Sequence, residues 1–319
     1  MNTTLIKVIC LLFIWIICSS WGFFAHQQIN KLAVFTLPVE MLTFYKKNLT
    51  YITAHAIDPD KRRYADTLEA PRHYLDVENY EENIDSIPFK WKDAVAKYGI
   101  PKLNKNGIVP WHIQRTYNSL VNAFKALDSI AILRYSADLG HYIGDAHVPL
   151  HTTHNHNGQL TGQIGIHGFW ESRIPEIFYE SYSLLTGRAI YVEDPLLQAW
   201  SIVKHSHKLV DTVLRFEKTL TEKFHSDRKY SYSERKNVVI KQYSVEFSAA
   251  YQTLVNSMVE RQMKASILAV GSFWYSAWAD AGQPALKNFK PKKYDSSFAQ
   301  SDNRTNEKFK KGILFGREL

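Results

Sequence analysis

The sequence predicts an all-α protein with a single multi-helix domain. Apolar residues recur three and four positions apart over most of the chain, and the alternation typical of strands is almost absent. Hydrophobic residues make up 45% of the 319 residues, which is ample material for one core. No internal repeat divides the chain. Because long helices without a sheet bury their apolar faces against one another, we expect the core between helices.

Residues 1–20 have the features of a secretory signal peptide. A lysine supplies the positive end, an apolar run too short to span a membrane follows, and small residues stand at 18–20. Cleavage there would make Trp21 the first residue of a secreted or periplasmic protein. A lipoprotein anchored at Cys18 is the alternative, which the bulky Ile17 disfavours. Both cysteines of the sequence lie in this segment, so we expect no disulfide in the mature chain.

The helical domain is expected to span residues 21–286. Pro38 marks a helix start, because proline is favoured at the beginning of helices. The longest periodic stretch, over about eight turns, is Thr116 to His147. Further helices are expected at Gly165 to Tyr182, Pro195 to Lys223 and Ser233 to Ala281. Loops are expected at Asp58 to Arg72 and His154 to Gly165, where Asp, Pro, Gly and Asn gather.

The net charge of +8 is unevenly distributed along the chain. Residues 287–319 hold nine Lys or Arg against four acids, and this polar segment is expected to be a disordered basic tail. The body keeps only roughly +2. The overall charge therefore gives no argument for a polyanionic partner.

Histidines and carboxylates recur four residues apart on two predicted helices. His141 and Asp145 share a helix face because residues i and i+4 lie one turn apart, and a proline turn lets His151 return to the same place. His167 and Glu171 repeat the pair on the next predicted helix. Since imidazole and carboxylate are zinc ligands, the pairs together predict a site for more than one cation.

Further candidate site residues lie upstream of these pairs. They are Asp58, Asp60, Arg63, His73 and Asp76, together with His26 close to the expected new N-terminus. The free amine and the carbonyl oxygen of Trp21 could chelate a metal together with His26. An internal tryptophan has no free amine and could not serve in this way.

With these residues the chain resembles the superfamily of bacterial zinc-dependent phospholipases C and fungal and plant single-strand-specific zinc nucleases. The resemblance covers the motifs from Trp21 to Glu171 and, more loosely, the helical remainder to Leu286. It implies three zinc ions with these ligands: Asp60, His73, His141 and Asp145 for one; His151, His167 and Glu171 for a second; Trp21, His26 and bridging Asp145 for the third. Asp58 is the alternative to Asp60, and the Asp-x-x-Arg pattern of Asp60 and Arg63 favours Asp60.

The chemistry of such a cluster suits phosphodiester hydrolysis. The reaction needs hydroxide at neutral pH, stabilisation of a more negative transition state, and neutralisation of the departing alkoxide, and zinc ions can meet all three needs. Zinc lowers the pKa of bound water to about 7. In this interpretation Asp60 orients the nucleophilic water, and Arg63 pairs with the phosphate.

Single-stranded nucleic acid is the expected substrate, and phospholipid is the alternative. The resemblance to the nucleases implies that Tyr74 stacks on a base and Asp76 binds its edge, which suits a nonspecific single-strand endonuclease. Glu171, where the nucleases usually have Asp, and the lack of disulfides favour phospholipase C instead. Membrane contact is expected only for a phospholipase, and no obligate protein partner is inferred.

A noncatalytic zinc-binding protein is the third hypothesis, because ligands alone do not prove turnover. Closed structural zinc sites use four ligands, often including cysteine. Nitrogen and oxygen ligands without a thiolate are typical of open, hydrolytic sites, so the ligand set favours an enzyme.

Overall fold

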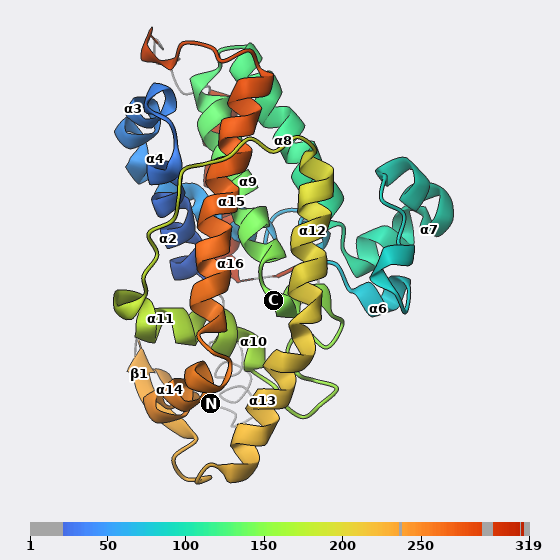
Figure 1. Ribbon diagram of the computed structural model, residues 1–319, viewed down its shortest axis with the longest axis vertical. Helices are drawn as coiled ribbons and strands as arrows, with labels where there is room; N and C mark the ends of the chain where they lie inside the picture. The colour runs from blue at the N-terminus through green and yellow to red at the C-terminus, as the bar shows by residue number, and fades with distance from the viewer. Residues whose placement is uncertain (1–21, 236–237, 289–295, 313, 316–319) are drawn as a thin grey trace, which may run out of the picture.

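The computed structural model describes residues 22–235, 238–288, 296–312 and 314–315. Helices dominate this part of the chain, and its strands form one two-stranded hairpin. In Figure 1 the long helices α9 (Ser129–Ala146), α15 (Met258–Asp280) and α12 (Pro195–Lys208) run along the molecule. The all-α prediction is confirmed. The expected signal peptide and Trp21 lie outside the described residues.

The other described helices lie around these three. In chain order they are α2 (Phe23–Ala33), α3 (Val39–Lys47), α4 (Leu49–Ala54), α5 (Asp58–Arg62), α6 (Val77–Tyr80), α7 (Trp91–Asn106), α8 (Val109–Lys125), α10 (Ile166–Gly168), α11 (Ile174–Phe178), α13 (Val210–Lys223), α14 (Val245–Leu254) and α16 (Ser296–Lys311). A short π-helix, η7 (Phe169–Arg173), joins α10 to α11, and the 3-10 turns η3 (His55–Ile57), η4 (Ala70–Arg72) and η6 (Pro149–Thr152) also carry residues of the site.

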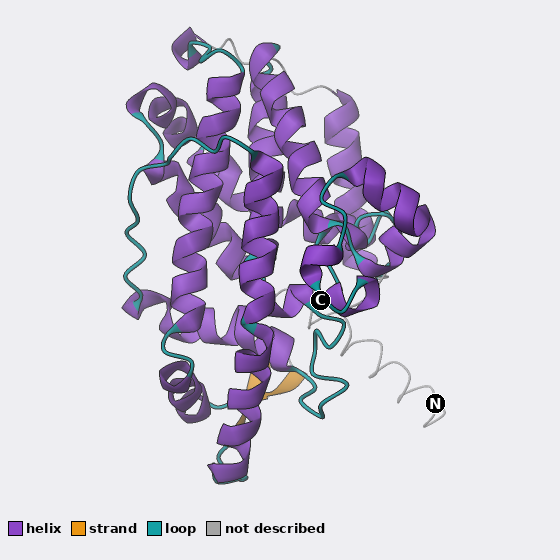
Figure 2. Ribbon diagram, turned by 45° about the vertical axis from the view of Figure 1, so that its right-hand side comes forward, coloured by secondary structure: helices purple, strands orange, loops and turns teal. Residues whose placement is uncertain are grey.

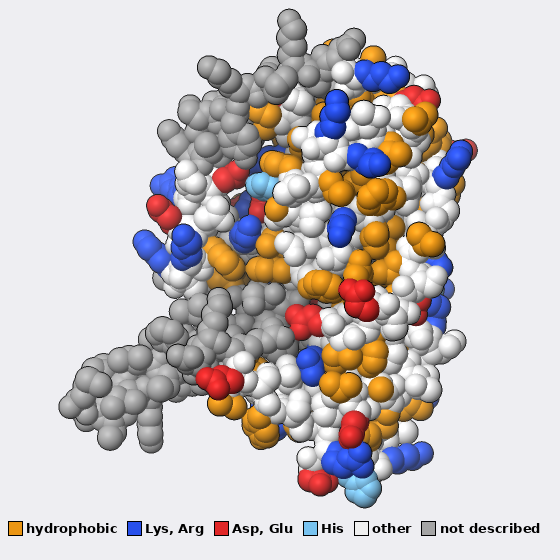
Figure 3. All heavy atoms as spheres, turned by 90° about the vertical axis from the view of Figure 1, so that its left-hand side faces the viewer, with side chains coloured by type: hydrophobic (Ala, Val, Ile, Leu, Met, Phe, Trp, Pro, Cys, Tyr) orange, Lys and Arg blue, Asp and Glu red, His pale blue; other side chains and the backbone are white. Residues whose placement is uncertain are grey.

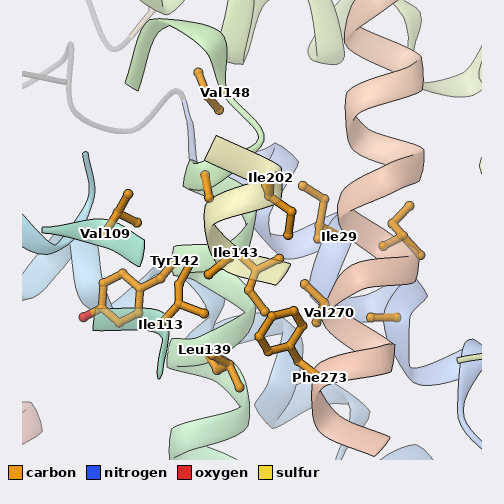
Figure 4. Close-up of a cluster of buried hydrophobic side chains, with 14 of the residues drawn as sticks. Ile29, Val109, Ile113, Leu139, Tyr142, Ile143, Val148, Ile202, Val270 and Phe273 are labelled. Carbon is orange, nitrogen blue, oxygen red and sulfur yellow. The ribbon is translucent and has the colours of Figure 1, made fainter. Parts of the chain in front are cut away.

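The core lies between α9 and its neighbours. Leu139 and Ile143 of α9 lie beside Val270 and Phe273 of α15 (Figure 4), and all four side chains are fully buried. Complete burial of one such side chain stabilises the fold by about 1.5–3 kcal/mol. Packing on several sides therefore fixes α9, the helix that carries the His141 and Asp145 pair.

Two glycines of α9 let α2 approach closely. A Cβ atom on Gly140 would lie 2.1 Å from Asn30 Oδ1, and one on Gly144 would lie 2.9 Å from His26 Nδ1. Both distances are too short for a methyl group. Because α9 has no side chain at these two points, His26 of α2 can stack on His141 with 4.0 Å between ring centroids.

The prediction of one helix over Thr116 to His147 is wrong, because a turn separates α8 from α9. Leu127 adopts a left-handed φ of 52° there. The Asp128 carboxylate then accepts a hydrogen bond from the backbone N–H of Ala131 at 3.1 Å, which caps the start of α9. The stretch from Pro195 to Lys223 is likewise two helices, α12 and α13. Apolar periodicity continues across both turns, so it could not reveal them.

The helix predicted from Ser233 is also wrong at its beginning, where the chain forms strands. β1 (Tyr230–Arg235) pairs antiparallel with β2 (Val238–Tyr243), as the orange ribbon of Figure 2 shows. Alternating Tyr and Ser in β1 and β-branched residues in β2 favour this pairing. The base of the hairpin is anchored where the Tyr243 ring stacks on Phe169 at 4.0 Å between centroids.

The C-terminal segment differs from the expected disordered tail, since it contains α16. The Phe309 ring of this helix lies 5.0 Å from the Tyr64 ring and 6.0 Å from the Phe23 ring, measured between centroids. Composition predicted disorder because the segment is polar and basic. A few aromatic contacts nonetheless hold it against the body of the protein.

None of the described helices combines the length and the apolar character that a membrane crossing requires. The face drawn in Figure 3 carries hydrophobic side chains in separate patches between charged ones.

An extended segment after α11 follows α15, where the N–H groups of Ile190 and Val192 donate to the hydroxyls of Ser272 and Ser276. Side chains of α15 thus satisfy the backbone of this connection.

Candidate metal centre

The structure brings together eight of the nine predicted ligands near the C-terminal end of α9. They come from separate elements: His26 from α2, Asp60 from α5, His73 from the turn after η4, His141 and Asp145 from α9, His151 from η6, His167 from α10 and Glu171 from η7. All are buried except Asp60, which is half-buried. The ninth, Trp21, precedes the first described residue.

The first group has the dimensions of a tetrahedral site. His73 Nδ1 lies 3.1 Å from His141 Nε2, and each of these nitrogens lies 3.7 Å from Asp60 Oδ1. Asp145 Oδ2 lies 2.9 Å from His73 Nδ1 and 3.2 Å from His141 Nε2. Tetrahedral zinc with bonds of 2.0–2.1 Å would have ligand atoms about 3.3 Å apart. The four residues therefore fit one zinc ion.

The second group offers three ligand atoms. His167 Nε2 lies 3.0 Å from His151 Nε2 and 2.7 Å from Glu171 Oε2. His151 Nε2 and Glu171 Oε2 lie 3.4 Å apart. Three protein ligands leave a fourth position for water or substrate, as in hydrolytic zinc sites. The group thus fits an open site.

Asp145 connects the two groups to His26. While its Oδ2 faces the first group, its Oδ1 lies 3.3 Å from His26 Nε2 and 3.5 Å from His151 Nδ1. The second oxygen of Glu171, Oε1, lies 3.2 Å from His26 Nε2. His26 therefore meets Asp145, as the sequence predicted, and Glu171 in addition.

Backbone carbonyls fix the orientation of two imidazoles. His141 Nδ1 donates to the carbonyl oxygen of Ala56 at 2.8 Å, and His151 Nδ1 donates to that of His73 at 3.1 Å. A carbonyl accepts only from an N–H group, so the proton of each ring is on Nδ1. The lone pair on Nε2 then faces the centre, as metal binding requires.

The buried carboxylates are held in their charged form. Burial alone would raise the pKa of Asp145, but the neighbouring His141 and His151 hold that pKa well below its ordinary value. Burial likewise opposes ionisation of Glu171, and His151 and His167 lower its pKa well below the usual range. Unbalanced buried charge is costly, so a cluster of ionised carboxylates and imidazoles without thiolates suits divalent zinc.

A cavity of about 440 Å³ opens beside the cluster. Both predicted catalytic residues line it, with Arg63 Nη1 3.8 Å from Asp60 Oδ1. Apolar side chains form part of the wall: Phe23, Ile164, Ile240 and Leu314. Arg173 and Lys241 add positive charge, and the carboxylates among the described lining residues all belong to the metal groups. The cavity therefore suits an anionic group attached to an apolar body.

The structure does not support the predicted roles of Tyr74 and Asp76, because neither residue lines this cavity. Tyr74 is 3% exposed, its hydroxyl donates to the carbonyl oxygen of Lys105 at 3.2 Å, and its ring packs against Gly107. Asp76 is 5% exposed. Because the Tyr74 ring is buried, a nucleic-acid base cannot stack on it. These two residues therefore do not support a nuclease.

Asp60, and not Asp58, lies in the metal group. The Asp58 carboxylate instead pairs with His55 and with Lys61, whose Nζ lies 3.1 Å away. Burial opposes ionisation of Asp58, but these two partners lower its pKa. Asp58 therefore has a local structural role at the start of α5.

Sequence reasoning missed Glu69 and the aromatic and apolar walls of the cavity. Glu69 stands four residues before His73, a spacing that could have drawn attention to it. Ile240 could not be found in this way, because it lies in a segment that was expected to be helical. Tyr230 lies just before that segment, where no element was predicted.

Comparison with known proteins identifies the family. A family model described as zinc dependent phospholipase C matches residues 25–256, which is most of the chain and includes all eight described candidate ligands. A search of curated proteins finds no match. The chain belongs to the zinc-dependent phospholipase C family and is a hydrolase that acts on phosphoric ester bonds.

Proposed function

We propose that this protein is a secreted or periplasmic phospholipase C that uses three zinc ions to cleave phospholipid head groups. The observation that carries this choice is the apolar wall of the cavity beside the candidate metal groups, formed by Phe23, Ile164, Ile240 and Leu314. A diacylglycerol is largely apolar and would lie against such a wall. The membership in the phospholipase C family supports the same choice.

The proposed ligand sets are Asp60, His73, His141 and Asp145 for one ion; His151, His167 and Glu171 for a second; and Trp21, His26 and Asp145, with Glu171 nearby, for the third. When bound, zinc supplies a nucleophilic hydroxide at neutral pH and stabilises negative charge on the phosphate and the departing oxygen. These roles need no side-chain nucleophile, since the attacking group comes from water.

Two residues of the cavity would act directly on the reaction. The Asp60 carboxylate accepts a hydrogen bond from the attacking water and orients it toward phosphorus. The Arg63 guanidinium lies 3.8 Å from Asp60, and a guanidinium is suited to donate hydrogen bonds to phosphate oxygens as their charge grows. Both side chains line the cavity, so one phosphate can meet both of them.

Single-stranded nucleic acid is the second candidate substrate. Arg63, Arg173 and Lys241 are cations suited to a phosphate backbone. The half-buried Tyr230 also lines the cavity, and Lys241 Nζ lies 3.9 Å from the centre of its ring. A base could stack there instead of on Tyr74.

Product analysis distinguishes the candidates. The chain beginning at Trp21, loaded with zinc, would be incubated with phosphatidylcholine vesicles, single-stranded DNA and RNA, with Asp60→Asn as the inactive control. We expect diacylglycerol and phosphocholine from the vesicles. Release of nucleotides alone would support the nuclease, and inertness toward all three would support a noncatalytic zinc-binding protein.

A further inference from the structure

The Glu69 carboxylate lies behind the candidate metal groups, away from the cavity. It is fully buried and does not line the cavity, so it meets no substrate. It immediately precedes η4, and its Oε1 lies 3.6 Å from Nε2 of His73. This distance is a few tenths of an ångström longer than a hydrogen bond. The contact is therefore directed at the rear of a candidate ligand.

The His73 imidazole has its two nitrogens in different surroundings. Its Nδ1 faces Asp145 Oδ2 at 2.9 Å and His141 Nε2 at 3.1 Å, so Nδ1 is the nitrogen available to a metal. A metal-binding nitrogen carries no proton, which places the proton on Nε2. That Nε2 is buried and makes no hydrogen bond within the described chain. It needs an acceptor, and Glu69 is in front of it.

The Glu69 carboxylate is itself firmly held. Arg62 Nε donates to Oε2 at 3.3 Å, Arg72 donates to the same oxygen, and the Tyr142 hydroxyl donates to Oε1. Two arginines on one oxygen balance the negative charge of this buried carboxylate. The carboxylate is thus charged, immobile and able to accept one more hydrogen bond.

Tyr142 extends the same network to a second candidate ligand, because it follows His141 in α9. Its ring meets the His73 ring edge to face with 5.4 Å between centroids. Arg62 reaches from Glu69 to Asp138 of α9, where Nη2 lies 3.0 Å from the carboxylate. The network therefore connects the turn that carries His73 with the helix that carries His141.

We propose that Glu69 is a positioning residue of the four-ligand site: its carboxylate accepts a hydrogen bond from the Nε2–H group of His73, which turns Nδ1 toward zinc. Arg62, Arg72 and Tyr142 keep the Glu69 carboxylate in place for this purpose. The inference rests on the zinc site alone and is independent of which phosphodiester is cleaved. A carboxylate behind a metal-binding histidine fixes the orientation of the ring and makes it a better ligand.

Zinc affinity of the full chain from Trp21 tests the proposal, measured by competition with a chromophoric chelator. We expect Glu69→Gln to weaken one zinc site by about 10–100-fold and to leave the others unchanged. Cobalt substituted for zinc would show a changed absorption spectrum for that site. Wild-type affinity at all sites in Glu69→Gln would overturn the proposal.

Glu217→Gln is the matched control, because Glu217 is also a buried carboxylate with a cationic partner, Lys229 at 2.9 Å. It should lower thermal stability and leave zinc affinity unchanged; an equal loss of affinity would show a merely structural effect. If Glu69→Gln does not fold, Glu69→Asp keeps the charge beside the arginines and draws the carboxylate back from His73. Its zinc affinity should also fall, and an unchanged affinity would refute the positioning role.

Discussion

The two oxygens of Asp145 face different histidines, and this explains how one side chain can belong to two metal groups. Oδ2 faces His73 and His141, whereas Oδ1 faces His26. The sequence predicted the pair of His141 and Asp145 because helical spacing alone puts them on one face. Helical spacing did not separate Asp58 from Asp60, since that choice depends on which carboxylate turns inward. The preference for Asp60 came from the Asp-x-x-Arg pattern.

The two aspartates of α5 give a paired test at the residue scale. We expect Asp60→Asn to lower kcat/KM by about 10²–10⁴-fold, because the substitution removes a ligand and the group that orients water. Asp58→Asn should keep near-wild-type activity and zinc content, since Asp58 pairs with His55 and Lys61 outside the metal group. Initial rates and elemental analysis of both variants check this. The reverse pattern would assign the ligand to Asp58.

The elements of the site were predictable to different degrees. Periodicity located α9 but joined it to α8, because a left-handed Leu127 and the Asp128 cap leave the apolar pattern intact. The hairpin was missed, since its tyrosines and valines also suit a buried helix face. Its place is set by tertiary contacts, above all by Tyr243, which stacks on Phe169 and whose hydroxyl donates to Glu217.

The contact between α2 and α9 gives a test at the element scale. Gly140→Ala would force a methyl group into Asn30 and should lower the free energy of unfolding by about 1–3 kcal/mol. Gly144→Ala should also displace His26 and weaken zinc binding. Denaturant unfolding and zinc titration measure the two effects. Gly187→Ala, whose Cβ meets no atom within 4 Å, is the control, and equal losses in all three variants would contradict the packing argument.

Glu217, which accepts a hydrogen bond from the Tyr243 hydroxyl at the base of the hairpin, gives a pH-dependent test. Burial opposes ionisation of Glu217, but Lys229 and Gln163 lower its pKa, so the unfolded chain takes up a proton there at higher pH than the folded protein. Its stabilisation is therefore present above the ordinary glutamate pKa of about 4.3 and is lost as pH falls through the lower, folded value.

Glu217→Gln should accordingly lower the free energy of unfolding at pH 7 by about 3 kcal/mol, because Lys229 loses its buried partner. The difference from the wild type should shrink as the pH falls below 4. Denaturant unfolding as a function of pH, with the zinc content held constant, measures this. A difference that does not change with pH would contradict the ionised state of Glu217.

At the scale of the whole molecule, the metal centre unites elements from the N-terminal α2 to η7. Helical periodicity predicted the all-α class, and helical spacing predicted the pairs of His141 with Asp145 and of His167 with Glu171. The complete set of candidate ligands was implied by the resemblance to a known superfamily. Neither the periodicity nor the resemblance could predict the cavity, because its walls combine Phe23 near one end of the described chain, Ile240 of the hairpin and Leu314 near the other end. Such a wall depends on contacts between distant segments.

Zinc removal tests whether the metal centre stabilises the whole molecule. The buried carboxylates and histidines are costly without a cation, so metal binding contributes to folding stability. We expect a chelator to lower the thermal midpoint and added zinc to restore it; zinc at 100 times its Kd would contribute about 2.7 kcal/mol for one site. Differential scanning calorimetry measures the shift. An unchanged thermal midpoint after complete zinc removal would contradict a contribution of metal binding to folding stability.

The most direct measurement is a crystallographic anomalous difference map at the zinc absorption edge, from the chain that begins at Trp21. A trinuclear phosphodiesterase should give three peaks: one among Asp60, His73, His141 and Asp145, one among His151, His167 and Glu171, and one beside His26 and the Trp21 amine. A zinc-loaded, active crystal without peaks at these positions would contradict the proposed metal centre.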